Sequence, residues 1–235
     1  MMYVKDTKRR KWAMLQKWEN LLFVHWSVSA ELLKKHLPPG LELDLWEDSA
    51  WISIVTFKVN KTRIRYLPRI PYIPSMLQVN VRTYVTKNGE KGVYFFTVDT
   101  NKLSAATGAR LFTLPYFKAS MKMTKRFGFF TMISSRNKSN AKWKVRYKSQ
   151  GNPSYPDPSS IDHWLLERYV AWSYKYGKLY RGDIKHSCWK VQQAKMEIKE
   201  NSLLAFLSKQ LKKKQPIIHF AESKVAVNWI PKKEE

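Results

Sequence analysis

Two alternating segments on either side of an Asn-Gly pair constrain the fold of this chain more than any other feature. Valines at positions 79, 81 and 85 alternate with more polar side chains along residues 78–86, and residues 92–100 form a second strand-like segment. Between them, Asn88 and Gly89 supply the positive φ angles that a tight hairpin turn requires. The sequence therefore predicts an antiparallel hairpin over residues 78–100.

Short strands and few helices are predicted for the rest of the chain. Further strands are expected at residues 18–26, 41–46, 50–59, 118–124, 128–134, 142–148, 171–176, 178–186, 192–199, 217–220 and 224–229. Short helices are expected at residues 29–37, 102–113, 161–169 and 202–210. This composition favours a mostly β (α+β) fold, with an antiparallel sheet and peripheral short helices. We expect a single domain over residues 1–235 with a basic, flexible tail at 1–11; the loop at 151–160 is the only candidate domain boundary.

Composition limits the class of protein. The chain has 235 residues, of which 44% are hydrophobic, enough to bury one sizeable core. No apolar run is long enough to span a bilayer, and no signal-peptide core follows the basic N-terminus. The single cysteine, Cys188, excludes an internal disulfide, and no histidines stand at metal-ligand spacing. We therefore expect a cytoplasmic protein with no metal and no cofactor.

The formal net charge of +25 calls for an explanation. No Asp or Glu occurs between Lys118 and Pro156, and residues 142–148 alternate cations with Trp143, Val145 and Tyr147. On a strand, all of these cations share one face and the three large apolar residues point into a core. Such a surface attracts nucleic acid or an anionic surface. The alternative interpretation is the solvated outer face of an edge strand.

Two arginines on otherwise apolar elements are the best candidates for a binding site. Asn80 and Arg82 point away from the valines of their strand, into either solvent or a pocket. Arg110 lies in a predicted helix among small residues. A buried guanidinium pairs with a carboxylate of the protein, here Asp99 or Glu167, or binds the carboxylate of a ligand. Signatures of nucleotide-binding loops, serine hydrolases and zinc proteases are absent from the sequence.

Lys118 is the nearest candidate for Schiff-base chemistry. It follows the apolar segment 114–117 and shares a strand face with Ser120 and Lys122. On the interior face it would be a costly, functional lysine, whereas on the exterior face it would be an ordinary solvated side chain.

The segment Gly108–Lys118 resembles the turn that carries the reactive lysine of acetoacetate decarboxylases, with Tyr116 and Phe117 in place of the lysine pair. The chain as a whole resembles the YqjF-like family of uncharacterised bacterial proteins over roughly residues 12–200. The resemblance is carried by residues 21–26, 37–43, 50–51, 80–85, 92–96, 109–110, 114–116 and 179–184, with His186 and Trp189. It implies an acetoacetate decarboxylase-like fold, a closed, cone-shaped antiparallel β barrel with flanking helices and an internal cavity.

The same resemblance argues against decarboxylase chemistry. By position, the reactive lysine falls at Tyr116 and the glutamate that accompanies it falls at Gln78, so we expect no acetoacetate decarboxylase activity. The combined prediction is a barrel that binds a small organic ligand, which could be acidic. The candidate ligand-binding residues are Gln78, Asn80, Arg82, Arg110 and Tyr116. The alternative function is a basic protein that binds nucleic acid or an anionic surface.

Overall fold

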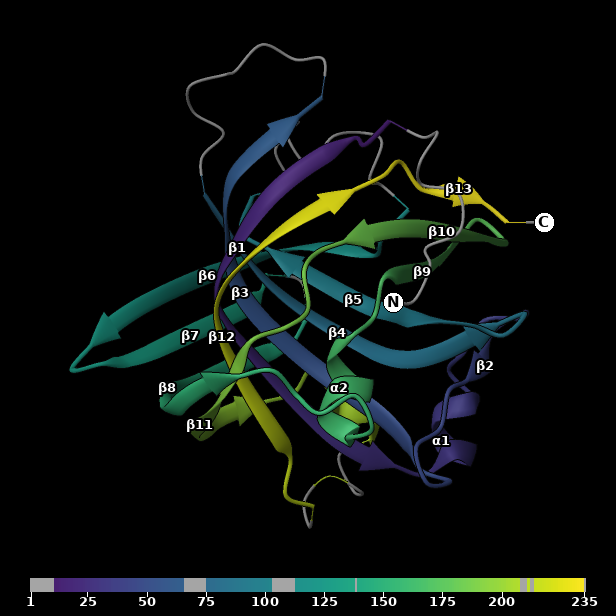
Figure 1. The fold of residues 1–235 in the computed structure, drawn as a ribbon. Helices are drawn as coiled ribbons and strands as arrows, with labels where there is room; N and C mark the ends of the chain where they lie inside the picture. The colour runs from purple at the N-terminus through teal and green to yellow at the C-terminus, as the bar shows by residue number, and fades with distance from the viewer. Residues whose placement is uncertain are drawn as a thin grey trace.

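Thirteen strands in one hydrogen-bonded sheet make up most of the structure (Figure 1). The computed structural model describes residues 11–65, 75–102, 113–137, 139–207, 211 and 214–234. The strands are β1 (Met14–Val28), β2 (Glu42–Leu43), β3 (Ala50–Ile64), β4 (Met76–Lys87), β5 (Glu90–Thr100), β6 (Tyr116–Arg126), β7 (Phe129–Arg136), β8 (Lys142–Ser154), β9 (Val170–Lys175), β10 (Lys178–Lys185), β11 (Val191–Asn201), β12 (Ile217–Asn228) and β13 (Lys232–Lys233). Two short helices, α1 (Ala30–Lys34) and α2 (Ile161–Leu166), and the 3-10 turn η3 (Ala205–Leu207) accompany them.

The predicted hairpin is confirmed and lies in the middle of the sheet. Strands β4 and β5 pair in antiparallel register from Gln78 opposite Thr100 to Lys87 opposite Glu90. The turn residues Asn88 and Gly89 have φ angles of 52° and 76°. Beside the hairpin, β3 pairs with β4, β1 pairs with β3, and β12 pairs with β1.

The sheet forks at two of its strands. Along the edge that faces away from β4, β5 pairs in parallel with β9 at residues 93–94 and with β6 at residues 98–100. Along the edge that faces away from β1, β12 pairs with β11 at residue 220 and with β10 at residues 227–228. Two branches therefore run between β5 and β12. The short branch is β9–β10 and the long branch is β6–β7–β8–β11.

Two chain segments connect the long branch and the short branch, and both contribute to the core. One segment, residues 155–169, leads from β8 to β9 and contains α2, whose first turn is capped by the Ser160 hydroxyl, which accepts a hydrogen bond from the backbone N–H of His163. The other segment, residues 186–190, leads from β10 to β11. Leu166 from the first segment and Trp189 from the second pack with Phe23 and Phe57 in one apolar cluster.

Alternation along β8 builds the largest apolar cluster. Trp143, Val145 and Tyr147 are fully buried, and their neighbours on the other face are exposed. The predicted separation of cations from core residues is confirmed. The prediction of an edge strand is wrong, because β8 lies between β7 and β11.

Several predicted boundaries are corrected by pairings between distant segments. The two strands predicted at 217–220 and 224–229 are one continuous strand, β12, because β1 pairs along its whole length. Strand β8 continues to Ser154, into the predicted loop, because Val191 pairs there. The strand predicted at 41–46 shortens to β2. Of the helix predicted at 202–210, the described residues form only η3, and α1 and α2 end at Lys34 and Leu166. The helix predicted at 102–113 lies mostly outside the described residues.

Candidate functional site

A cavity of about 100 Å³ lies at the fork of the sheet. Strands β1, β3, β4 and β5 form one wall, and Leu114, Ala171, Ile184 and Trp189 contribute from the branches and their connections. Most of the lining is apolar. The polar and charged side chains that reach it include Gln78, Asn80, Arg82, Tyr116, Arg168 and His186.

Four of the five candidate ligand-binding residues border this one cavity. Gln78, Asn80 and Arg82 are successive residues on one face of β4, while Val79 and Val81 on the other face belong to the largest apolar cluster. Tyr116 enters from the first position of β6. The sequence left open whether this face of β4 meets solvent or a pocket, and the structure shows a pocket. Arg110 lies outside the described residues.

Lys118 lies outside the cavity lining. Side-chain alternation is interrupted after Tyr116, because Phe117 and Lys118 are both exposed before Ala119 is buried. Lys118 therefore has the exterior position that the sequence left open as the ordinary one.

Arg82 has no carboxylate partner among the described residues. Asp99 is instead bound by Arg136, with Nη2 at 2.6 Å and Nε at 2.7 Å from Oδ1. Glu167 accepts hydrogen bonds from the Tyr169 hydroxyl and from the backbone N–H of Trp189. The interaction that favours the charged form of Arg82 is with Tyr84, and among the described residues the Arg82 Nε is buried without a partner. Burial lowers the pKa of Arg82, because removing a cation from water disfavours the charged form.

A buried polar cluster holds that tyrosine in place. The Tyr84 hydroxyl lies 2.8 Å from Nδ1 of His25 and 2.6 Å from Oγ of Ser53, and Ser53 Oγ lies 2.7 Å from the same His25 nitrogen. Burial holds the pKa of His25 well below its usual value, so the ring is neutral near pH 7. This cluster fixes the Tyr84 hydroxyl, the group whose interaction favours the charged form of Arg82.

Arg168 is a second cavity arginine, and the sequence did not predict it. Its Nη1 lies 2.5 Å from Oδ2 of Asp44, its Nε donates to the carbonyl of Trp164, and its guanidinium lies 4.4 Å from the centre of the Trp164 ring. The charge of Arg168 is thus balanced within the protein, unlike that of Arg82. The sequence offers no signal for this, because Asp44 stands 124 residues away.

Tyr116 and Gln78 face each other where the decarboxylases are expected to carry a lysine and a glutamate. Burial raises the pKa of Tyr116 to about 12, and its interaction with the Gln78 side chain opposes part of that shift. The phenol therefore stays protonated at neutral pH and can donate a hydrogen bond. Both groups are neutral, so this pair can orient a ligand but cannot form a Schiff base.

Asp183, His186 and Cys188 lie close together in sequence but do not form a catalytic set. Cys188 is exposed, Asp183 accepts a hydrogen bond from Arg181, and His186 lies among the rings of Tyr169 and Trp189. Within the described ranges, no group of three His, Cys, Asp or Glu side chains could hold a metal ion. No helix of the described residues is both long and apolar enough to cross a membrane.

The fold and its central cavity place this protein in the acetoacetate decarboxylase-like fold. The acetoacetate decarboxylase-like enzyme from Sphingomonas wittichii RW1 superposes with a TM-score of 0.64 at 11% identity, covering 96% of this chain and 94% of that one. The acetoacetate decarboxylase from Legionella pneumophila gives 0.64 at 12%, covering 98% and 93%. The enduracididine biosynthesis enzyme MppR complexed with pyruvate gives 0.65 at 10%, covering 97% and 93%.

Sequence relatives define the family more closely. The family model DUF2071, described as an uncharacterized conserved protein, matches residues 15–224, and this chain belongs to that family. The chain is 37% identical over 220 residues to the uncharacterized protein YqjF of Bacillus subtilis (strain 168), covering 93% of this chain and 91% of that protein. The resemblance to YqjF-like proteins is confirmed, and the fold class is confirmed as mostly β and acetoacetate decarboxylase-like.

Proposed function

We propose that this protein binds a small organic carboxylate in the cavity at the fork of the sheet. The observation that carries the proposal is Arg82, a guanidinium beside an apolar cavity with no carboxylate partner among the described residues. A buried charge without a partner costs several kcal/mol, so proteins keep one where a ligand supplies the opposite charge. A planar guanidinium binds a carboxylate through two parallel hydrogen bonds.

The cavity volume limits the size of the ligand. An apolar cavity of about 150 Å³ holds benzene, which has six non-hydrogen atoms. A volume of about 100 Å³ therefore fits a ligand of roughly four to six such atoms. Short keto or hydroxy acids have this size and offer a second oxygen for the Tyr116 hydroxyl.

Each polar group at the cavity has a part in the proposed complex. Arg82 binds the carboxylate, Tyr116 donates to a carbonyl or hydroxyl oxygen, and Asn80, whose Oδ1 is buried without a partner, accepts from a ligand hydroxyl. MppR was crystallised with pyruvate, a carboxylate of this size, on the same fold. Decarboxylation through a Schiff base is not part of the proposal, because Tyr116 and Gln78 carry neither the amine nor the acid.

The proposal includes the closed, cone-shaped barrel that the family resemblance implies and the cytoplasmic location that the composition favours. It is supported by the pairing order, in which β5 and β12 are linked by each of the two branches as well as through β4, β3 and β1. Nucleic-acid binding, the alternative function, gains no support from the relatives named above.

Thermal unfolding in the presence of a panel of small acids tests the proposal. The panel pairs acetate, pyruvate, lactate and acetoacetate with neutral amides of the same shape, and the variants are Arg82→Gln and, as a matched control, Arg126→Gln. Arg126 is exposed at the end of β6, so both variants lose one positive charge. A ligand at about 100 times its Kd stabilises the folded state by about 2.7 kcal/mol.

We expect at least one acid to raise the Tm of the wild type and of Arg126→Gln but not of Arg82→Gln. The matching amide should have no effect on any of them. A carboxylate response that persists in Arg82→Gln would refute the assignment of Arg82 as the anchor.

A further inference from the structure

The outer face of the long branch is a dense array of cations that the cavity does not use. We define the basic face as the exposed residues Lys118, Lys122 and Arg126 of β6 and Lys142, Lys144, Arg146 and Lys148 of β8, together with the outer face of β7 between them. Backbone register brings these rows together, since Ile133 of β7 pairs with Lys122 on one side and with Lys144 on the other. The cations thus form two rows, on β6 and β8, that flank the outer face of β7.

Few carboxylates balance this charge. On the adjoining strand β11, Glu200 pairs with Lys142 at 3.4 Å, and Glu197 pairs with Lys199. Within the described part of the chain, Lys118, Lys122 and Lys144 have no carboxylate within ion-pair distance. Cations that repel one another on one surface destabilise the folded protein unless an anionic partner is present.

The hairpin of β6 and β7 projects from the body of the protein, at the left of Figure 1. Phe127, in the turn between the two strands, places an apolar ring at its tip. Phe127 is 82% exposed and has a φ angle of 49°, and Gly128 follows it with a φ of 77°. A bulky residue in the left-handed region is strained, and Asn or Gly would suit this turn better. An exposed phenylalanine that the turn itself disfavours indicates a contact outside the chain.

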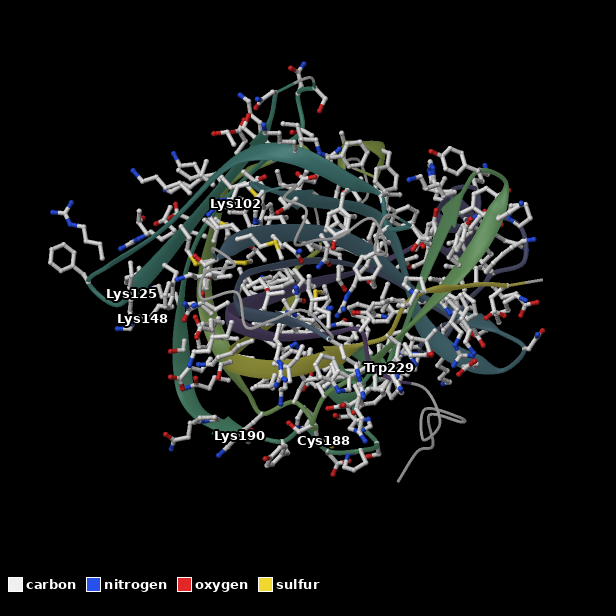
Figure 2. All side chains as sticks on the ribbon, turned by 90° about the horizontal axis from the view of Figure 1, so that it is seen from above. Lys102, Lys125, Lys148, Cys188, Lys190 and Trp229 are labelled. Carbon is white, nitrogen blue, oxygen red and sulfur yellow. The ribbon has the colours of Figure 1, made fainter. Side chains whose placement is uncertain are left out.

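The ring at the tip lies beside a cation of the basic face. The guanidinium of Arg126 lies 5.0 Å from the centre of the Phe127 ring. Figure 2 shows Lys125 and Lys148 close to this projecting end; Lys148 belongs to the basic face, whereas Lys125 lies on the other face of β6, with its ammonium 5.0 Å from the centre of the buried Phe130 ring. The basic face thus presents cations along its length and an apolar side chain at its end.

The arrangement fits a lipid bilayer better than a nucleic-acid strand. A single strand is held by bases that stack on open aromatic rings. Between the two rows of cations, the ring of Phe129 is covered by the guanidinium of Arg146 at 3.8 Å and by the ammonium of Lys148 at 5.8 Å, so it offers no open surface for stacking. The exposed apolar side chains, Phe127 and the 37% exposed Ile133, have no counterpart in a phosphate backbone but match the interfacial region of a membrane.

We propose that the basic face docks on an anionic lipid membrane, with its cations against lipid phosphates and Phe127 inserted between headgroups. Peripheral binding needs two signals, and this surface supplies a polybasic patch and an apolar anchor. Each Lys or Arg near such a surface strengthens binding about fivefold at moderate salt. Three neutralised lysines should therefore weaken binding roughly 100-fold.

Vesicle co-sedimentation of the full-length protein tests this proposal. The vesicles contain phosphatidylcholine alone or with one third phosphatidylglycerol, and a single-stranded RNA is assayed in parallel. The face variant is K118Q/K122Q/K144Q. The control K178Q/K232Q/K233Q removes the same charge from exposed lysines on β10 and β13, away from the long branch. A third variant, F127N, removes the ring and fits the positive φ angle.

We expect the wild type and the control variant to bind the anionic vesicles but not the vesicles of phosphatidylcholine alone. The face variant and F127N should lose most of the binding to anionic vesicles, while their circular dichroism spectra stay the same as that of the wild type. Equal losses in the face and control variants would mean that net charge alone acts, which would overturn the proposal. Binding to RNA but not to vesicles would replace the membrane with nucleic acid. Unchanged binding of F127N would overturn insertion of the tip.

Discussion

Replacing Arg82 with methionine should make the ligand-free protein more stable and abolish carboxylate binding. The substitution keeps the length and much of the volume of the side chain but removes a guanidinium that has no carboxylate partner among the described residues. Desolvation of such a charge costs several kcal/mol. The interaction with the Tyr84 hydroxyl returns about 1.5–3 kcal/mol, and the position of the guanidinium 5.8 Å from the centre of the Phe23 ring returns about 0.5–1 kcal/mol.

The balance is a net cost of Arg82 of about 1–2 kcal/mol, so Arg82→Met should raise the free energy of unfolding by that amount. The Tyr84 hydroxyl keeps its partners His25 and Ser53, so no new polar group is left unpaired. For a chain of this length, the gain corresponds to an increase in Tm of about 2–8 °C. Urea unfolding and calorimetry measure both quantities, and the carboxylate panel shows whether ligand stabilisation is lost.

Arg136→Met is the matched control, and its effect should have the opposite sign. Arg136 makes two contacts with Oδ1 of Asp99, which is fully buried. Removing the arginine leaves an uncompensated buried carboxylate, which costs about 3–5 kcal/mol. If Arg82→Met destabilises the protein as much as Arg136→Met does, Arg82 is a structural residue and the reasoning about an unpaired anchor is wrong.

Three further predictions follow from the core and the cavity. Tyr116→Lys places an amine in the cavity that Arg82 also lines, and both the apolar surroundings and the neighbouring cation lower a lysine pKa. Borohydride should therefore trap acetoacetate on the variant but leave the wild type, including Lys118, unmodified. An adduct on the wild type would contradict this assignment of the site. Gly92→Ala should lower the free energy of unfolding by about 2–3 kcal/mol, because a Cβ at this position would lie 2.7 Å from the Val170 carbonyl oxygen. Gly182→Ala is the control, since the atom nearest to its Cβ is 3.6 Å away. Equal losses of stability for the two variants in urea unfolding would contradict close packing of β5 on β9. Burial holds the pKa of His25 well below 6.5, so the contribution of His25 to the free energy of unfolding is complete above pH 6.5 and falls as the pH drops, by at most about 1.4 kcal/mol per pH unit. NMR should show an imidazole ring that stays neutral at pH 6. Titration of the ring at the usual histidine pKa would contradict its burial.

Local features of this chain could be predicted from sequence because their causes lie within a few residues. The Asn88-Gly89 turn fixes the central hairpin, and the alternation along β8 separates its cations from Trp143, Val145 and Tyr147. The cavity face of β4 followed from the same alternation. These predictions needed only the two-residue period of a strand.

The remainder depends on contacts between distant segments, for which a single sequence carries no periodic signal. The bond of Arg168 to Asp44 spans 124 residues, and that of His25 to Tyr84 spans 59. Asp99 and Glu167 were the candidate partners of Arg82 within the protein because each carries a negative charge. The structure shows that Asp99 binds Arg136 and that Glu167 accepts hydrogen bonds from Tyr169 and Trp189. Strand continuity in β12 and the interior position of β8 depend on which strands lie beside them, and sequence alone does not show this.

The fork of the sheet has a consequence for how a ligand would reach the cavity. Within the described strands, no backbone pairing joins the short branch to the long branch, and Leu166, His186 and Trp189 from the connecting segments line the cavity. If the proposed ligand enters between the branches, entry requires side chains and connecting segments to shift, on the nanosecond-to-microsecond scale, rather than strands to separate. In that case the amide protons of β5 and β12 should stay protected while the ligand exchanges, so residence time and global stability would be set by different parts of the molecule.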